Sequence, residues 1–207
     1  MKIGAIVICR YNSSRLPGKI LKKINGKPIL TYIIERLKCV QNLDDFIVAT
    51  SINTTDQPIV DYCIKNQIKY FRGSLENVAE RFLHAGLKFH YDYAIRVNGD
   101  NLFLDHKLIS EMISVLDLNH YDLVSNVKDR TFPKGISVEI VNINFYKKLF
   151  NEFNHSKYQE HVTNYMYEYP DCGNFYHFIN HTLPHAAGAQ LAIDTVSYTH
   201  LRAHETE

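Results

Sequence analysis

The chain has 207 residues, of which 45% are hydrophobic and 22% charged, a composition typical of an ordinary globular domain. Its 23 basic and 22 acidic side chains leave a net charge of +1, which excludes a global field that attracts nucleic acid or an anionic membrane surface. No apolar run approaches the roughly 20 residues of a membrane helix, and the N-terminal apolar stretch does not resemble a signal peptide. The four cysteines lack the spacing of a zinc site or redox motif. We therefore expect a cytoplasmic protein whose cysteines are reduced packing residues.

Strands and helices are predicted to alternate along the first two thirds of the chain. Residues 2–9 form a continuous β-branched apolar run, typical of a strand buried on both faces, and Pro28 opens a helical pattern after a long loop. The patterns predict further strands at 45–51, 68–72, 93–97 and 122–125, and helices at 56–66, 75–89 and after Asp105. This alternation predicts one α/β domain with a mostly parallel sheet and helices on both faces.

The pattern changes from Arg130 onward. A Pro/Gly turn leads to an alternating strand at 137–141, a helix near 144–153, and a polar stretch rich in histidine and tyrosine. The histidines at 155, 161, 177, 181 and 185 do not show the helical spacing with a glutamate that marks a zinc protease. We interpret them as surface or interface residues.

The loop after the first predicted strand, "CRYNSSRLPGK", concentrates positive charge. Together with the residues that follow, it contributes five cations, Arg10, Arg15, Lys19, Lys22 and Lys23. Ser13 and Ser14 add hydroxyl donors, and Gly18 allows close approach of the backbone. Arginine forks and lysine charges beside free backbone N–H groups suit phosphate oxygens, so the loop predicts a polyphosphate site. It matches neither a Walker A loop nor a G-x-G-x-x-G fingerprint, and the alternative interpretation is a solvated basic turn.

Carboxylates are expected at the same edge of the sheet. Asp100 follows the fourth predicted strand behind a glycine, and ligands of open α/β sheets bind at the carboxyl ends of the strands. Mg²⁺ binds through one or two carboxylates together with substrate phosphates, so Asp100 is a candidate metal ligand and Asp194, in "LAIDT", is the second. The alternative for both is a structural role, in a turn or as a helix cap.

The stretch "FRGSLENVAERF" places Arg72 and Ser74 at a strand-to-helix turn. Both are candidates for nucleotide binding, although Ser74 could instead cap the helix. Arg81, on the predicted helix, is expected to form a surface ion pair.

These motifs resemble bacterial cytidylyltransferases that make CMP-activated acidic sugars. "RYNSSRLPGKIL", "INGKPIL" and "IIERL" are similar to the amino-terminal signature of that family. "FRGSLENVAERF", "RVNGDNLFLD", "SNVKDRTFPKGISVEI" and "QEHVTNYMYE" resemble most closely the branch named after spore-coat polysaccharide biosynthesis protein F. The resemblance covers about residues 1–195. It implies a three-layer α/β/α Rossmann-like nucleotidyltransferase fold, a homodimer, and Mg²⁺-dependent transfer of CMP from CTP to an acidic sugar with release of pyrophosphate, for surface polysaccharide biosynthesis.

The resemblance also implies roles for individual residues. The loop from Arg10 to Lys19, including Asn12, Ser13 and Ser14, would bind CTP, with Arg15 and Lys19 carrying most of the charge and acting in catalysis beside Asp100. Asp100 and Asp194 match the family's metal-binding aspartates. The residues expected in the sugar-facing and dimer-facing region are Arg130, Lys134, Glu139 and His161.

The chain departs from the family after Asp194 and Thr195, where relatives continue with Pro-Glu-Asp and a helix. Here the sequence reads "VSYTHLRAHETE", which resembles a translated sequencing adapter. We therefore expect a cytidylyltransferase domain at 1–195 that lacks the family's terminal helix, and a non-native tail at 196–207. Two alternatives stay open: a nucleotidyltransferase for another base or for a sugar 1-phosphate, and a relative that binds CTP without turnover.

Overall fold

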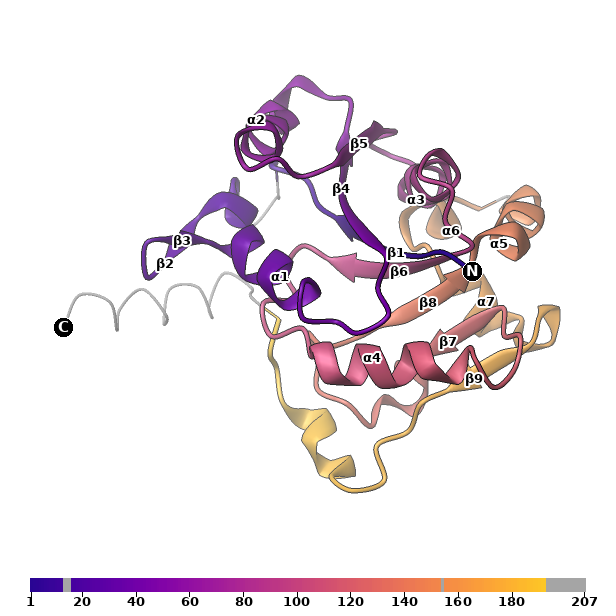
Figure 1. Ribbon diagram of the computed structural model, residues 1–207. Coiled ribbons are helices and arrows are strands. Elements are labelled where there is room, and N and C mark those ends of the chain that lie inside the picture. The colour runs from indigo at the N-terminus through magenta and orange to yellow at the C-terminus, as the bar shows by residue number, and fades with distance from the viewer. Residues whose placement is uncertain (13–15, 154, 193–207) are drawn as a thin grey trace.

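A seven-stranded sheet forms the centre of the computed structural model, which describes residues 1–12, 16–153 and 155–192 (Figure 1). Its strand order is β5-β4-β1-β6-β8-β7-β9. The strands span Ile3–Ile8 (β1), Asp45–Ser51 (β4), Tyr70–Gly73 (β5), Tyr93–Asn98 (β6), Leu123–Ser125 (β7), Glu139–Asn142 (β8) and Phe175–His177 (β9). The four strands from β5 to β6 are parallel, β8 is antiparallel to both of its neighbours, and β9 is parallel to β7. The predicted mostly parallel sheet is confirmed.

Helices cover both faces of this sheet, which gives the predicted three layers (Figure 1). One face carries α1 (Ile29–Leu37), α2 (Gln57–Lys65) and α4 (His106–Val115). The other carries α3 (Val78–Lys88), α5 (Ile143–Leu149), α6 (Ser156–Glu160) and α7 (Asn164–Glu168). The sheet therefore separates two apolar cores, and β1 contributes to both, because Val7 packs on the α1 side and Ile6 on the α3 side.

Short elements connect these layers. The loop after β1 ends in a 3₁₀ turn, η1 (Lys19–Leu21). A short antiparallel hairpin follows, formed by the two-residue strands β2 (Lys23–Ile24) and β3 (Lys27–Pro28). The other 3₁₀ turns are Thr54–Asp56, Lys128–Arg130, Phe150–Glu152, Pro170–Cys172 and Pro184–Gly188. Asp105 caps α4 as predicted, since its Oδ1 accepts from the backbone N–H groups of Lys107 and Leu108.

Several sequence predictions can be compared with this fold. All four cysteines are free thiols, and Cys9 and Cys63 are buried as expected, whereas Cys39 is exposed because it follows the last turn of α1. Four of the five histidines considered above are exposed, and His177 is half-buried on β9. No helix among the described residues is long and apolar enough to cross a membrane. The predicted boundary at 195/196 lies outside the described residues.

Candidate functional site

A cavity of about 710 Å³ lies at the carboxyl ends of β1 and β6. Its walls come from the loop after β1, from α3, from the end of β6, and from α6 with the residue that follows it. The charged side chains that line it include Arg10, Lys19, Arg81, Arg96 and Asp100. This is the edge at which open α/β sheets bind their ligands.

Gly99 allows the ends of β1 and β6 to approach each other closely. A Cβ at this position would lie 2.7 Å from the Cβ of Cys9 and 3.0 Å from the Cδ1 of Ile20, and the Gly99 N–H donates to the carbonyl of Ile8. At this point two of the predicted catalytic residues, Lys19 and Asp100, lie side by side. The Nζ of Lys19 is 3.1 Å from the Oδ2 of Asp100. The sequence separates these two residues by 81 positions.

The opening loop is anchored by Asp56, a residue that the sequence analysis did not identify. Asp56 is fully buried, and its Oδ1 accepts from the backbone N–H of Tyr11 at 2.7 Å. Its Oδ2 accepts from Thr50 Oγ1 at 2.9 Å and from both the backbone N–H and the hydroxyl of Ser51, at 2.9 and 2.5 Å. Burial raises the pKa of this carboxyl, but the hydrogen bonds from Ser51, Tyr11 and Thr50 outweigh burial and hold the pKa below its ordinary value. An ionised Asp56 thus joins the start of the loop to the end of β4.

The structure describes some of the predicted CTP-binding residues of this loop. Arg10 lines the cavity, and Asn12 is exposed and lies outside the cavity wall. Ser13, Ser14 and Arg15 lie outside the described residues, as does the second predicted metal ligand, Asp194. Their roles stay predictions.

Arg72 and Ser74 hold the turn between β5 and α3 and do not line the cavity. The Arg72 guanidinium donates to the carbonyls of Ser51, Ile52 and Asn53, at 2.9–3.0 Å. The hydroxyl of Ser74 accepts from the backbone N–H of Asn77, whose own side chain caps α3. Both residues therefore have structural partners, and their predicted contacts with the nucleotide stay predictions.

Arg81 corrects one prediction. It is 2% exposed and forms part of the cavity wall, so the expected surface ion pair is wrong. Its Nη1 donates to the carbonyl of Ser74 at 2.8 Å, and its Nε is buried without a partner in the described part of the chain. Burial lowers the pKa of Arg81, and the nearby charge of Arg10 lowers it further.

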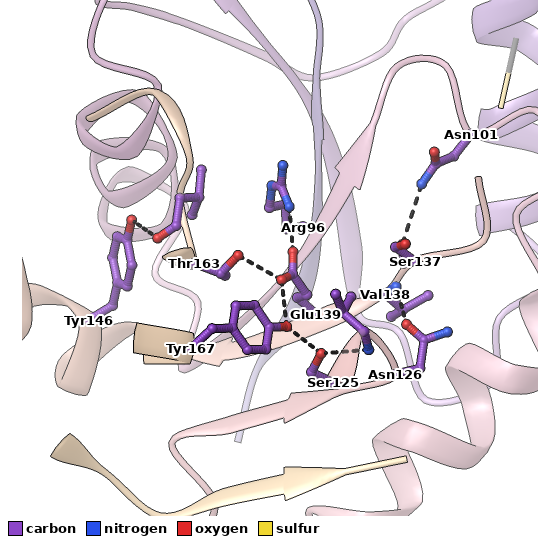
Figure 2. Close-up of polar contacts among 12 residues, drawn as sticks. Arg96, Asn101, Ser125, Asn126, Ser137, Val138, Glu139, Tyr146, Thr163 and Tyr167 are labelled. Carbon is purple, nitrogen blue, oxygen red and sulfur yellow. Dashed lines mark hydrogen bonds and ion pairs between the residues drawn. The ribbon is translucent and has the colours of Figure 1, made fainter. Parts of the chain in front are cut away.

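Glu139 is the centre of a buried hydrogen-bond network rather than a side chain on the cavity wall (Figure 2). It is 2% exposed, and its Oε2 accepts from Arg96 Nη1 at 2.5 Å. Its Oε1 accepts from the hydroxyls of Thr163 at 2.6 Å and Tyr167 at 2.8 Å. The Tyr167 hydroxyl in turn pairs with Ser125 at 2.5 Å, which links β6, β8, β7 and α7. Burial lowers the pKa of Arg96, but Glu139 more than offsets this and keeps the guanidinium charged.

The other predicted sugar-facing residues are divided. His161 lines the cavity directly after α6. Arg130 and Lys134 lie outside the cavity wall, and the backbone of Lys134 pairs with Ala189 and Leu191. Arg96, which the sequence analysis did not select, reaches the cavity through its pairing with Glu139.

A mostly parallel sheet with a charged cavity at the ends of β1 and β6 is the arrangement typical of α/β proteins that bind nucleotides. The chain belongs to the cytidylyltransferase family, whose model matches residues 4–199. It is 33% identical over 208 residues to an uncharacterized protein of Methanocaldococcus jannaschii, covering 99% of this chain and 84% of that protein. It is also 33% identical over 174 residues to the spore coat polysaccharide biosynthesis protein SpsF of Bacillus subtilis, covering 80% of this chain and 70% of that protein.

Solved structures agree with this assignment. A cytidylyltransferase from Leptospira borgpetersenii superposes with a TM-score of 0.91 at 28% identity, covering 98% of this chain and 86% of that one. The CMP:2-keto-3-deoxy-manno-octonic acid synthetase in complex with CTP shares the fold, with a TM-score of 0.71 at 15% identity over 100% of this chain and 99% of that one. The resemblance to the family and to its SpsF-like branch is confirmed, and the chain is a CTP-utilising nucleotidyltransferase.

Proposed function

We propose that the chain transfers CMP from CTP to a hydroxyl of an acidic sugar of the ulosonate or nonulosonate type and releases pyrophosphate, in surface polysaccharide biosynthesis. The pairing of Lys19 with Asp100 at the mouth of the cavity carries this proposal, because it places a cation and a carboxylate where a nucleotide triphosphate and its metal meet. Two partial similarities support the substrate class. The chain is 33% identical over 128 residues to an 8-amino-3,8-dideoxy-manno-octulosonate cytidylyltransferase of Shewanella pealeana, covering 56% of this chain and 48% of that protein. It is 31% identical over 137 residues to a 3-deoxy-manno-octulosonate cytidylyltransferase of Geotalea daltonii, covering 63% of this chain and 51% of that protein. The resemblance also implies a cytoplasmic homodimer.

The donor set fits Mg²⁺. No group of three or more His, Cys, Asp or Glu side chains able to hold a metal occurs among the described residues, so a transition-metal cage is not built there. Asp100, beside Lys19 in the cavity wall, is the kind of carboxylate that Mg²⁺ uses when phosphates and waters complete its coordination. Asp100, with Asp194 as the second carboxylate, would hold the ion. Bound Mg²⁺ would supply charge neutralisation at the phosphate that is transferred.

Different residues of the cavity would bind the two substrates, CTP and the sugar acid. Arg10, Arg15 and Lys19 would bind the triphosphate and hold its α-phosphorus in line with the acceptor hydroxyl. The hydroxyl oxygen forms the new bond to that phosphorus, the bond to pyrophosphate breaks, and the hydroxyl proton is lost. Arg96 lines the cavity and is oriented by Glu139, which suits its guanidinium to the carboxylate of a sugar acid. Gln159 and His161 add polar groups on the same side.

The test is binding followed by turnover. Calorimetry with CTP, UTP and GTP, each with and without Mg²⁺, should give selective CTP binding that Mg²⁺ strengthens. Pyrophosphate release should then appear with 3-deoxy-manno-octulosonate or an acylneuraminate as acceptor. Asp100→Asn should abolish turnover while the fold persists, and the exposed Asp61→Asn should leave it unchanged.

Each other result has a defined meaning. Binding of UTP or GTP in preference to CTP would favour the transferase for another base, and release with a sugar 1-phosphate but no sugar acid would change the acceptor class. CTP binding without turnover with any acceptor would favour the inactive relative. A near-native rate for Asp100→Asn would refute the metal assignment.

A further inference from the structure

Arg81 is a buried cation without an acidic partner. Its side chain is 2% exposed, and across residues 1–12, 16–153 and 155–192 it forms no ion pair. Asp56 favours the charged form of Arg81, but its two oxygens already accept four hydrogen bonds from other groups. A buried charge is normally paired, because its loss of hydration is otherwise uncompensated. Among the described residues, therefore, no acidic side chain is paired with Arg81.

The position of Arg81 is fixed by its surroundings. It extends from the first turns of α3 across Gly73, where an added Cβ would lie 2.9 Å from the Cγ of Arg81. Its Nη1 donates to the carbonyl of Ser74, while its Nε has no hydrogen-bond partner among the residues that the structure describes. Since the side chain forms part of the cavity wall, its guanidinium is placed to donate to a ligand there.

The neighbours of Arg81 indicate which ligand this is. Arg10, on the loop after β1, lines the same cavity as Arg81, so the two cations face one space. Cys9 directly follows β1 and lines the same cavity, and burial raises the pKa of its thiol, so it stays neutral and cannot serve as the counterion. Arg96 differs in this respect, because Glu139 already balances its charge.

We propose that Arg81 is a ligand of the CTP triphosphate, and that it grips a phosphate oxygen together with Arg10 from the α3 side of the cavity. This inference rests on the CTP-dependent function proposed above and adds a residue to the nucleotide site. The motif "FRGSLENVAERF" then has two parts: Arg72 and Ser74 shape the turn before α3, and Arg81, near the start of α3, reaches the nucleotide.

Arg81→Met tests this, because methionine keeps much of the side-chain length and removes the charge. We expect calorimetry to show CTP binding weakened about 10- to 100-fold, the range for one lost charge-assisted hydrogen bond. Because an uncompensated buried charge is removed, the melting temperature without CTP should be equal to or higher than that of the wild type. Arg81→Lys should recover part of the CTP affinity, since it restores the charge without the fork.

Arg36→Met is the matched control. Arg36 lies on α1, outside the cavity wall, and its Nη1 also donates to a backbone carbonyl, that of Leu104 at 3.1 Å. CTP affinity in this variant should stay within about twofold of the wild type.

Two results would overturn the inference while the proposed function stands. One is a CTP affinity of Arg81→Met within about twofold of the wild type. The other is a loss of CTP affinity together with a lower melting temperature without CTP, which is the signature of a purely structural arginine. A wild-type chain that binds no CTP would instead overturn the proposed function, and this inference with it.

Discussion

Asp56→Ala should destabilise the protein strongly, because one buried carboxylate serves four donors. The substitution leaves the backbone N–H groups of Tyr11 and Ser51 without acceptors, while the hydroxyls of Thr50 and Ser51 can turn to other partners. A buried donor that loses its acceptor costs about 1–3 kcal/mol, so the two N–H groups together give about 4 kcal/mol. In a chain of this length each kcal/mol lowers the melting temperature by about 2–4 °C, and we expect a loss of about 8–16 °C.

Thermal unfolding followed by circular dichroism measures this effect. The control is Asp61→Ala on α2, an exposed carboxylate that accepts only from the side chain of Gln57, and it should change stability by less than about 0.5 kcal/mol. Asp56→Ala should also weaken CTP binding, since the loop after β1 loses its tie to β4. Equal melting temperatures for the two variants would refute the assignment of Asp56 as the anchor.

The same residue has a pH dependence with a defined sign. The pKa of Asp56 in the folded protein lies below its ordinary value of 3.8, so the unfolded chain takes up the proton first as pH falls. The stabilisation from Asp56 is therefore fully present above about pH 5 and is lost as pH falls through 3.8 toward the folded-state pKa. The difference in stability between the wild type and Asp56→Asn should shrink over that window. A difference that grows on acidification would contradict the ionised state.

Two further variants test the walls of the cavity. Glu139→Gln should lower the free energy of unfolding by about 3–5 kcal/mol, because Arg96 loses its partner. For the same reason it should raise the KM for the sugar acceptor more than the KM for CTP. The control, Glu35→Gln, removes an exposed pair with Lys27 and should cost less than about 1 kcal/mol in the same unfolding assay. Gly99→Ala should lower the free energy of unfolding by about 1–3 kcal/mol and weaken CTP binding, because the added Cβ would lie 2.7 Å from the Cβ of Cys9. The control is Gly188→Ala, whose added Cβ meets no atom within 4 Å and should change neither measurement.

The sequence was sufficient for the fold because local signals repeat there. The apolar run of β1, the helical spacing of α1 and the cap at Asp105 each specify an element over a few residues. The sequence was also sufficient to predict that Lys19 and Asp100 lie at the same edge of the sheet, because residues that follow parallel strands meet there. The two side chains form an ion pair at that edge. The register of the sheet, which sets this distance, is decided by packing between elements and is not visible in either segment alone.

Arg81, Arg96 and Asp56 were missed for a shared physical reason: their significance comes from burial, which depends on the partner layers. Arg81 follows a helical pattern that also fits a solvent-facing position, and only the packing of α3 against the sheet encloses it. Asp56 reads as the start of a helix, a common place for aspartate, whereas its oxygens serve the neighbouring strand and loop. Arg96 carried the clearest signal, because a charged residue inside an apolar strand needs a partner.

Arg81 and Arg96 differ in whether their charge is paired within the protein, and this difference indicates which ligand suits each end of the cavity. Arg96 has its charge balanced by Glu139, so a ligand at that side gains hydrogen bonds without having to neutralise the protein. Arg81 and Arg10 form no ion pair among the described residues, so their side of the cavity favours a ligand that brings negative charge of its own. A triphosphate carries several negative charges and a sugar acid carries one. The end near β1 is therefore suited to the nucleotide, and the end near α6 to the acceptor.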